Sequence, residues 1–301
     1  MSADAIITGL GFCGMDYLCL VPRVPLDDKV EILQSSTQGG GPSVSAITAA
    51  ARLGATTAFV GCVGGDQRGR DIVTGLAAEG VDVSGMKIRE GAESAAGFCW
   101  IEKQTGKRSI AWTRGTAKPL SADEVPSERI RSSRVLHLDG HQTTAAIAAA
   151  ELASQHGVTV SIDAGTIVPG IERLLGVANL IIASEPFACR YTGLSEPEAA
   201  VRKLFTGKCR FSGVTMGREG SLGFDGQQIY HCPAFEVDTV DTTGAGDVFH
   251  GAFAFAYAQG QGWRECLRFA SAVAALKCTK FGGRAGSPDL KTTEEFLERH
   301  D

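Results

Sequence analysis

The chain has no long apolar run, no basic excess and no paired cysteine motif, and each absence excludes a class of protein. No segment approaches the roughly 20 apolar residues that cross a bilayer, so we expect no membrane span. A net charge of −5 argues against a nucleic-acid binder, which needs a basic face to neutralise phosphates. The first apolar segment, 5–10, lacks the basic flank of a signal peptide, and the nine cysteines show no C-x-x-C spacing. We therefore expect a cytoplasmic protein with reduced cysteines, largely in the core.

The rest of the composition predicts a globular α/β protein. Its 301 residues, of which 44% are hydrophobic, suffice for one large domain or for one domain with a small appendage. Short apolar runs predict buried strands at 5–10, 57–63, 135–138, 158–162, 180–183 and 211–215. The stretches between them predict helices at 43–53, 70–79, 144–156, 169–175 and 197–205. Such alternation is typical of a largely parallel sheet covered by helices on both faces, which binds ligands beyond the carboxyl ends of its strands.

Two stretches interrupt this alternation. Residues 17–36 combine apolar positions with Pro22, Pro25 and two consecutive aspartates, which indicates strand and loop. Residues 98–113 alternate apolar and polar side chains around a Lys-Gln-Thr-Gly-Lys turn, which predicts a β-hairpin. Neither stretch fits a helix-covered parallel sheet, so the hairpin is either an edge decoration or part of a second, smaller sheet.

The most informative segment is 241–251, which reads Asp-Thr-Thr-Gly-Ala-Gly-Asp-Val-Phe-His-Gly. Gly244, Ala245 and Gly246 stand between a turn-forming sequence and a predicted helix. Small residues let backbone N–H groups crowd together at a helix N-terminus, where free donors and the helix dipole favour an anion. Asp247 either caps this helix or takes a proton from a hydroxyl beside the anion. An anion cradle with an adjacent base indicates phosphoryl transfer to an alcohol.

These eleven residues resemble the hallmark near the C-terminus of the PfkB (ribokinase-like) family of carbohydrate kinases, and the resemblance covers almost the whole chain. It implies a ribokinase-like α/β fold whose central, mostly parallel sheet has helices on both faces and a small β-sheet lid. It implies one kinase domain over 1–301, with lid insertions at approximately 13–36 and 92–117. A lid of this kind often pairs two subunits. The implied partners are therefore a sugar, ATP and a second copy of the chain, with no nucleic acid or membrane.

A second family motif predicts the sugar site. Residues 38–45 read Gln-Gly-Gly-Gly-Pro-Ser-Val-Ser and resemble the family's Gly-Gly pair, so Gly40 and Gly41 are expected to let a polyol approach the backbone. Family members usually have Asn where this chain has Ser45, whose reach is shorter. Asp16 matches the carboxylate that the family places on sugar hydroxyls, and without the resemblance it would be interpreted as a capping or solvated aspartate.

Other polar residues near the predicted site are less specific. Arg114 follows the hairpin, where its guanidinium either faces the substrate or the transferring phosphate, or is solvated. His137, Asp139 and His141 alternate after a strand and superficially resemble metal ligands. Period-two spacing without a fourth ligand favours ordinary polar positions at the end of a strand.

The resemblance also predicts the nucleotide half of the site. Residues 215–220 resemble the family's T-x-G-x-x-G turn, which receives ATP phosphates through backbone amides and a Thr hydroxyl. An Ala-rich helix ending near 279 and a Gly-Gly loop are implied to flank the adenine, and the loop backbone can help to hold a monovalent cation such as K⁺. The cofactor-binding residues that this predicts are Thr215, Gly217, Gly220, Thr243, Cys278, Gly282 and Gly283.

One family hallmark is missing. Family members usually carry Asn-x-x-Glu after the strand predicted at 180–183, where it organises water around Mg²⁺, but residues 184–187 read Ser-Glu-Pro-Phe. Mg²⁺ is still required chemically, because it neutralises the β- and γ-phosphates during transfer. Glu185 is the candidate to act through a water, and Asp163, at the preceding strand end, is the alternative.

Segments within 235–289 resemble bacterial sulfofructose kinases, a branch of the same family. That branch holds its sulfonate with an Arg, an Asn and a backbone Gly, and these positions align near Gly140, Trp112 and Asp28. None of the three carries a cation, and Asp28 would repel a sulfonate. We therefore predict an ATP-dependent kinase for a primary hydroxyl of a neutral ketose or related sugar, with Asp247 as the base. The alternatives are a sulfofructose kinase, a nucleoside kinase that stacks its base on aromatic residues of the lid, and a ligand-sensing pseudokinase.

Overall fold

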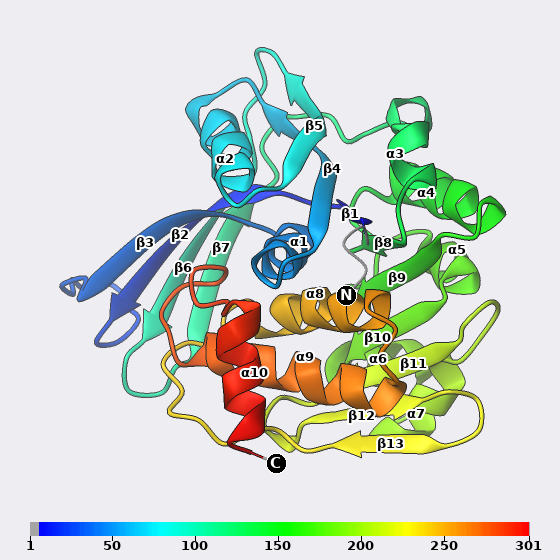
Figure 1. Cartoon of the computed structure of the whole chain (residues 1–301). Coiled ribbons are helices and arrows are strands. Elements are labelled where there is room, and N and C mark those ends of the chain that lie inside the picture. The colour runs from blue at the N-terminus through cyan, green and yellow to red at the C-terminus, as the bar shows by residue number, and fades with distance from the viewer. Residues whose placement is uncertain (1–5, 301) are drawn as a thin grey trace.

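The computed structural model describes residues 6–300 and contains a central nine-stranded sheet (Figure 1). Its strand order is β13-β12-β11-β10-β9-β8-β1-β4-β5, and only the pairings β11–β12 and β12–β13 are antiparallel. The strands are β1 (Ile6–Leu10), β4 (Thr56–Gly64), β5 (Asp82–Arg89), β8 (Val135–Leu138), β9 (Thr159–Ala164), β10 (Leu180–Ser184), β11 (Phe211–Thr215), β12 (Ser221–Phe224) and β13 (Ile229–Cys232). The six predicted strands are confirmed, although Ala5 lies outside the described residues. Strands β5, β12 and β13 were not predicted: β5 is a largely polar edge strand with little apolar periodicity, and β12 and β13 have only four residues each.

Helices cover both faces of this sheet, as the sequence predicts. They are α1 (Pro42–Arg52), α2 (Gln67–Ala78), α3 (Ser127–Arg131), α4 (Thr143–Gln155), α5 (Ile171–Val177), α6 (Glu185–Thr192), α7 (Pro197–Leu204), α8 (Ala245–Ala258), α9 (Trp263–Cys278) and α10 (Leu290–Glu298). Side chains alternate along each strand, so that Ile182 packs with α8 and α9 whereas Ile181 and Ala183 pack with α4 to α7. In the described part of the chain, no helix is long and apolar enough to cross a membrane.

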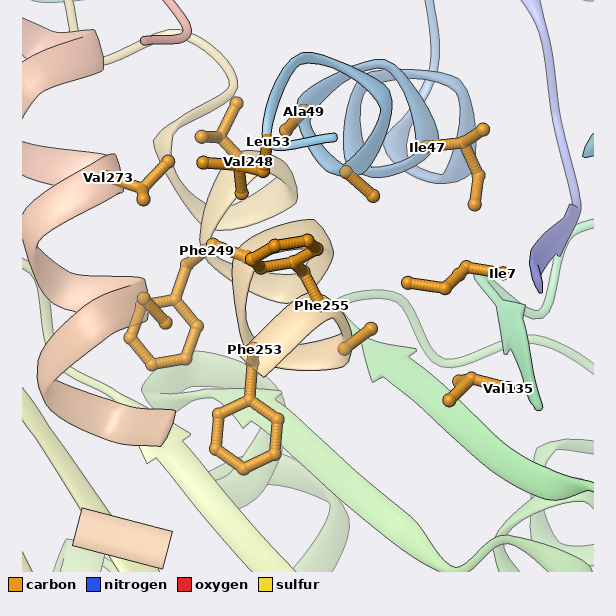
Figure 2. Packing of buried hydrophobic residues seen from close by; sticks show 14 of the residues in the cluster. Ile7, Ile47, Ala49, Leu53, Val135, Val248, Phe249, Phe253, Phe255 and Val273 are labelled. Atoms are coloured by element: carbon orange, nitrogen blue, oxygen red, sulfur yellow. The ribbon is translucent and has the colours of Figure 1, made fainter. Parts of the chain in front are cut away.

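The core between α1, α8 and the central sheet fixes the position of α8 relative to α1. Figure 2 shows Val248, Phe249 and Phe253 of α8 packed among residues of α1, α9 and the sheet. Helix α8 approaches α1 so closely that a Cβ on Gly251 would lie 2.0 Å from the carbonyl oxygen of Ala46. No larger residue fits this crossing without a shift of one helix. The close contact holds the N-termini of α1 and α8 in a fixed relation beside the central sheet.

A second sheet of four strands lies to one side of the central sheet, in the order β3-β2-β6-β7 (Figure 1). Its strands are β2 (Gly14–Val21), β3 (Gln34–Gly40), β6 (Ala96–Glu102) and β7 (Arg108–Thr113). The predicted hairpin is confirmed as the antiparallel pair β6–β7 and belongs to this sheet. The pairing register places Asp16, Gly97 and Trp112 on one face, and Arg108, four residues from Trp112 along β7, shares that face.

Candidate active site

The N-terminus of α8 is arranged to receive an anion. Gly244 has a positive φ of 75° immediately before the helix, a conformation that favours glycine. A Cβ on Gly244 would also lie 3.3 Å from the Cα of Gly283, so the two glycine loops are in contact. No side chain of the described residues caps α8. The amide of Ala245 donates to the carbonyl oxygen of Thr242 (3.2 Å), so the amides of Gly246 and Asp247 are the ones in the first turn that a ligand can reach. The predicted cradle of Gly244, Ala245 and Gly246 thus has the local geometry of an anion site.

Two cavities meet at this helix end. A cavity of about 240 Å³ is lined mainly by apolar and small residues, including Phe235, Phe249 and Ala274. A second cavity, of about 350 Å³, is lined by charged and polar residues, including Asp247. The cavities share four lining residues, namely Thr215, Thr242, Ala245 and Gly246. The apolar and the polar cavity therefore open onto the same anion cradle.

The predicted nucleotide residues separate into two groups. The apolar cavity is lined by Thr215, Gly217, Gly220 and Cys278. The other predicted residues are Thr243, Gly282 and Gly283, which do not line it. They belong to the loops behind the cradle, where the Asp241 carboxylate accepts hydrogen bonds from the amides of Thr243 (2.8 Å) and Gly282 (3.0 Å). Asp241 is buried and joins the two loops.

Asp247 lies on the wall of the polar cavity at the start of α8. Burial, together with a smaller contribution from the nearby Asp163 carboxylate, raises the pKa of its carboxyl to about 7. The charges of His250 and Arg108 act in the opposite direction. A carboxyl with a pKa near neutrality exchanges protons readily at physiological pH, which is the property that a general base requires.

A buried histidine–aspartate pair lies beside Asp247 and was not predicted from the sequence. His250 Nε2 is 3.2 Å from Asp163 Oδ1, and both residues line the polar cavity. Burial opposes ionisation of Asp163, but the charge and hydrogen bond of His250 lower the pKa of its carboxyl. His250 follows Asp247 by three residues, which places both on one side of the helix. The three-residue spacing could have indicated that His250 lies near Asp247. It could not have indicated that His250 has a partner on a strand distant in the sequence.

The three residues interpreted as polar strand-end positions have different environments. Asp139 accepts hydrogen bonds from the amides of Phe12 (2.9 Å), Ser43 (3.3 Å) and His141 (3.0 Å), so it joins the end of β1 to α1. Asp139 and His141 line the polar cavity. His137 is buried beneath it, and burial lowers the pKa of its ring to about 3. Within residues 6–300, no group of three or more His, Cys, Asp or Glu side chains is placed to hold a metal ion.

The predicted sugar residues lie close together at the start of β2 and of α1. Asp16 lies over the backbone of Gly40, where a Cβ would be 1.8 Å from its Oδ2. Burial raises the pKa of Asp16 to about 6, although the charge of Arg284 opposes the shift. Gly41 has a φ of 121°, and a Cβ there would meet the Phe12 carbonyl oxygen at 2.3 Å. Of this segment, Pro42 lines the polar cavity, whereas Asp16, Gly40, Gly41 and the buried Ser45 lie outside its lining.

The cationic residue of the hairpin that lines the polar cavity is Arg108, whereas the sequence singled out Arg114. Arg114 is exposed, and its guanidinium lies 5.0 Å from the centroid of the Trp112 ring. Side chains alternate along β7, so Arg108 and Trp112 share one face, and continued alternation would give Arg114 that face as well. Periodicity alone therefore did not distinguish the two arginines. The difference lies in position along the strand, since β7 begins at Arg108 and ends before Arg114.

The predicted magnesium residue does not line the polar cavity either. Glu185 is the first residue of α6, and its neighbour Ser184 lines the cavity instead. Phe187, at the position of the family's glutamate, is buried in the core, with its ring 5.5 Å from that of Tyr191. The alternative candidate, Asp163, does line the cavity. The polar cavity therefore contains an acidic side chain at this point, but it belongs to β9 and not to the start of α6.

Comparisons with known proteins agree with this geometry. The family model described as pfkB family carbohydrate kinase matches residues 10–290. The ATP-dependent ribose-1-phosphate kinase of Halopiger xanaduensis is 29% identical, covering 98% of this chain and 99% of its own, and fructokinase-1 of Zea mays is 30% identical over 97% of both. The solved structure of Arabidopsis thaliana ribokinase complexed with ribose and ATP superposes with a TM-score of 0.85. It is 26% identical and covers 98% of this chain and 99% of the Arabidopsis chain.

The match to the family model spans nearly the whole chain, and the sheet order, the glycine cradle and the paired cavities give it a structural basis. The chain belongs to the pfkB family of carbohydrate kinases.

Proposed function

We propose that the protein transfers the γ-phosphate of ATP to a primary hydroxyl of a ketose or related neutral sugar. The observation that carries the proposal is the junction of an apolar and a polar cavity at the uncapped N-terminus of α8. The apolar cavity suits a nucleotide base and the polar cavity suits a polyol. Phosphates that run between the two would pass over Gly244–Gly246. The Arabidopsis relative, whose structure contains both ribose and ATP, supports this assignment.

Asp247 is the proposed catalytic base. Its carboxylate removes the proton from the sugar hydroxyl as that oxygen attacks the γ-phosphorus. A new P–O bond to the sugar forms, the bond between the γ-phosphorus and the bridging oxygen breaks, and ADP leaves. The amides of Gly246 and Asp247 stabilise the charge on the transferring phosphoryl group, and such preorganised donors provide much of the rate enhancement.

Mg²⁺ fits the oxygen-rich wall formed by Asp163, Ser184 and Thr215. Mg²⁺ prefers oxygen ligands and usually keeps several waters while binding one or two carboxylates together with substrate phosphates. One carboxylate and two hydroxyls on this wall meet that requirement without Glu185. When bound, the ion neutralises charge on the β- and γ-phosphates. His250 holds the Asp163 carboxylate in place for this role.

The charges of the polar cavity support a neutral sugar. Its wall contains three carboxylates, from Asp139, Asp163 and Asp247, and one arginine, Arg108. Asp28, which aligns with the sulfonate-binding glycine, forms an exposed ion pair with Arg23. A sulfonate entering this site would rely on Arg108 alone to offset its desolvation. A relative that acts on ribose 1-phosphate leaves an anionic sugar as the second candidate.

The second sheet is the proposed lid. One of its faces presents Asp16 and Arg108, the latter at the polar cavity, so closure over the sugar would exclude water and suppress ATP hydrolysis. Its edge strand β7 is exposed throughout, and Ile110 and Trp112 retain exposed fractions of 52% and 58%. An exposed apolar edge strand favours pairing with another chain. We propose that the lid also forms a homodimer, in a cytoplasmic enzyme.

The test is a panel of acceptors scored by ADP release in Mg²⁺-ATP. Fructose, ribose, ribose 1-phosphate, sulfofructose and adenosine represent the neutral, anionic and nucleoside classes. We expect the highest kcat/KM for a neutral sugar. A preference for sulfofructose or ribose 1-phosphate would replace the neutral assignment by an anionic one, and a preference for adenosine would indicate a nucleoside kinase. Binding of ATP and sugar without turnover would identify a pseudokinase.

A further inference from the structure

Lys277, near the end of α9, is the one lysine among the largest fully buried side chains of the described residues. Its side chain is 0% exposed. Lysine is almost never fully buried unless it is paired, because removing an ammonium from water has a large free-energy cost. Burial accordingly lowers the pKa of Lys277, whereas the nearby Asp241 carboxylate acts to raise it. The burial of this ammonium group therefore requires favourable contacts that offset the cost of removing it from water.

The ammonium lies at the junction of the loops that form the anion cradle. Lys277 Nζ donates a hydrogen bond of 2.7 Å to the backbone carbonyl of Asp241. The Asp241 carboxylate binds the amides of Thr243 and Gly282, as described above. The backbone amide of Asp241 in turn donates to the carbonyl oxygen of Cys278, which follows Lys277. One ammonium and one carboxylate therefore link the end of α9, the loop before α8 and the Gly-Gly loop.

This arrangement has the chemistry of a monovalent-cation site. A bound K⁺ or NH₄⁺ would place a positive charge against a loop carbonyl beside a carboxylate. The Lys277 ammonium places the same charge in the same surroundings, and its –NH₃⁺ group is chemically similar to an ammonium ion. The family resemblance suggested that K⁺ binds near the Gly-Gly loop. At the Asp241 carbonyl, however, the Lys277 ammonium already provides the positive charge. A second monovalent cation at that carbonyl would meet a like charge in a buried setting, which is unfavourable.

We propose that the Lys277 ammonium is a built-in substitute for a monovalent cation and positions the anion cradle, so that the enzyme works without K⁺. Lys277 touches neither cavity and acts through Asp241 and the loop at 241–244. It is therefore a positioning residue. The inference rests on the proposed phosphoryl transfer, because the cradle matters only if phosphates bind there.

The test uses two substitutions that remove the same charge but differ in volume. Lys277→Ala leaves room at the Asp241 carbonyl for a small cation, whereas Lys277→Met fills most of that room with an uncharged chain. Lys280→Ala is the matched control, because Lys280 lies three residues further along and is exposed. Each protein is assayed at constant ionic strength in tetramethylammonium, Na⁺, K⁺ or NH₄⁺ chloride. The readouts are ADP release and the Kd of a fluorescent ATP analogue, with thermal unfolding to verify the fold.

We expect the turnover of the wild type and its Kd for the ATP analogue to change by no more than about twofold among the four salts. We expect the same of Lys280→Ala. In tetramethylammonium, Lys277→Ala should lose roughly 10²-fold in kcat because the cradle is misplaced, and K⁺ or NH₄⁺ should restore most of the loss. Lys277→Met should show a similar loss without rescue. If both variants fail to fold, the wild-type salt dependence still decides the matter.

Strong activation of the wild type by K⁺, or full activity of Lys277→Ala in tetramethylammonium, would overturn the inference. An analogue Kd that depends on K⁺ in Lys277→Ala and not in the wild type would support it even if no sugar is phosphorylated. That outcome separates a failure of the proposed function from a failure of the cation assignment.

Discussion

The two cavities at the start of α8 are built in different ways. The apolar cavity is lined by backbone turns and small residues from 215–220 and 234–278, within the C-terminal third of the chain. The polar cavity combines Arg108 of β7, Asp139 after β8, Asp163 of β9 and Asp247 of α8, which are widely separated in sequence. The first is shaped mainly by glycine and alanine and the second by charges. Under the proposed function, the nucleotide half is therefore sensitive to changes in side-chain volume, and the sugar half is sensitive to changes in charge.

The largest expected effect follows from removing the charge at the junction. Asp247→Asn should lower kcat by at least ~10²-fold, a typical general-base contribution, while the Kd values for ATP and sugar stay near those of the wild type. Steady-state kinetics and direct titration of each ligand measure the two quantities. Near-normal turnover in the purified variant would remove Asp247 from the mechanism. In the wild type, kcat/KM should fall on the acid side of about pH 7, because a protonated Asp247 cannot accept a proton.

A smaller effect should distinguish the two arginines of the hairpin. Arg108→Ala should lower kcat/KM for the sugar by roughly 10-fold, because Arg108 lines the polar cavity and its charge acts on Asp247. Arg114→Ala, the matched control, should stay within about twofold, since Arg114 is exposed over Trp112. Comparison of kcat/KM for both variants in one assay decides the assignment. The reverse order would restore Arg114 as the residue that faces the substrate.

A crossed pair of substitutions tests whether the two halves are independent. Asp16→Ala should raise KM for the sugar by roughly tenfold with little change in KM for ATP, because a hydrogen bond from a sugar hydroxyl to the carboxylate is lost. Ala274→Leu should do the reverse, because it fills part of the 240 Å³ cavity. Both Michaelis constants are measured for both variants. Equal changes in the two Michaelis constants would mean that the two cavities are coupled, which would contradict their independence.

The smallest effect is on stability. Because the folded-state pKa of Asp247 is raised from 3.8 to about 7, the native state holds this proton more tightly than the unfolded state. Stability contributed by the protonated group is fully present below pH 4 and is lost as pH rises towards 7. Asp247→Asn should therefore have a higher Tm than the wild type at pH 8 and an equal Tm at pH 4. Differential scanning calorimetry of the ligand-free proteins measures both. A lower Tm at pH 8 would contradict the electrostatic argument.

Cavity residues that lie within one local motif could be named from the sequence, whereas residues brought together from distant segments could not. Motifs such as 215–220 and 241–251 are contiguous, because a turn and the helix after it form one local structure, and Gly217, Gly220 and Asp247 of these motifs line the cavities. His250 and Asp163 meet only because α8 packs against β9, and no local pattern encodes that contact. Arg108 was missed for the same reason. The family resemblance implied a small second sheet built from residues 13–36 and 92–117, but its strand order depends on pairing between these distant segments and could not be predicted.

The contact between Gly251 and Ala46 has a consequence for engineering the enzyme. Because α1 and α8 leave no room for a side chain at this point, a larger residue at Gly251 would displace the Gly-Gly-Pro segment before α1 relative to the cradle before α8. A library that randomises residues around this crossing would mostly return inactive clones, whatever substrate is sought. Under the proposed function, a library confined to exposed positions of β7 other than Arg108 would vary the lid while the helix crossing stays intact. New sugar specificities are therefore best sought on one sheet, with the helix pair left as found.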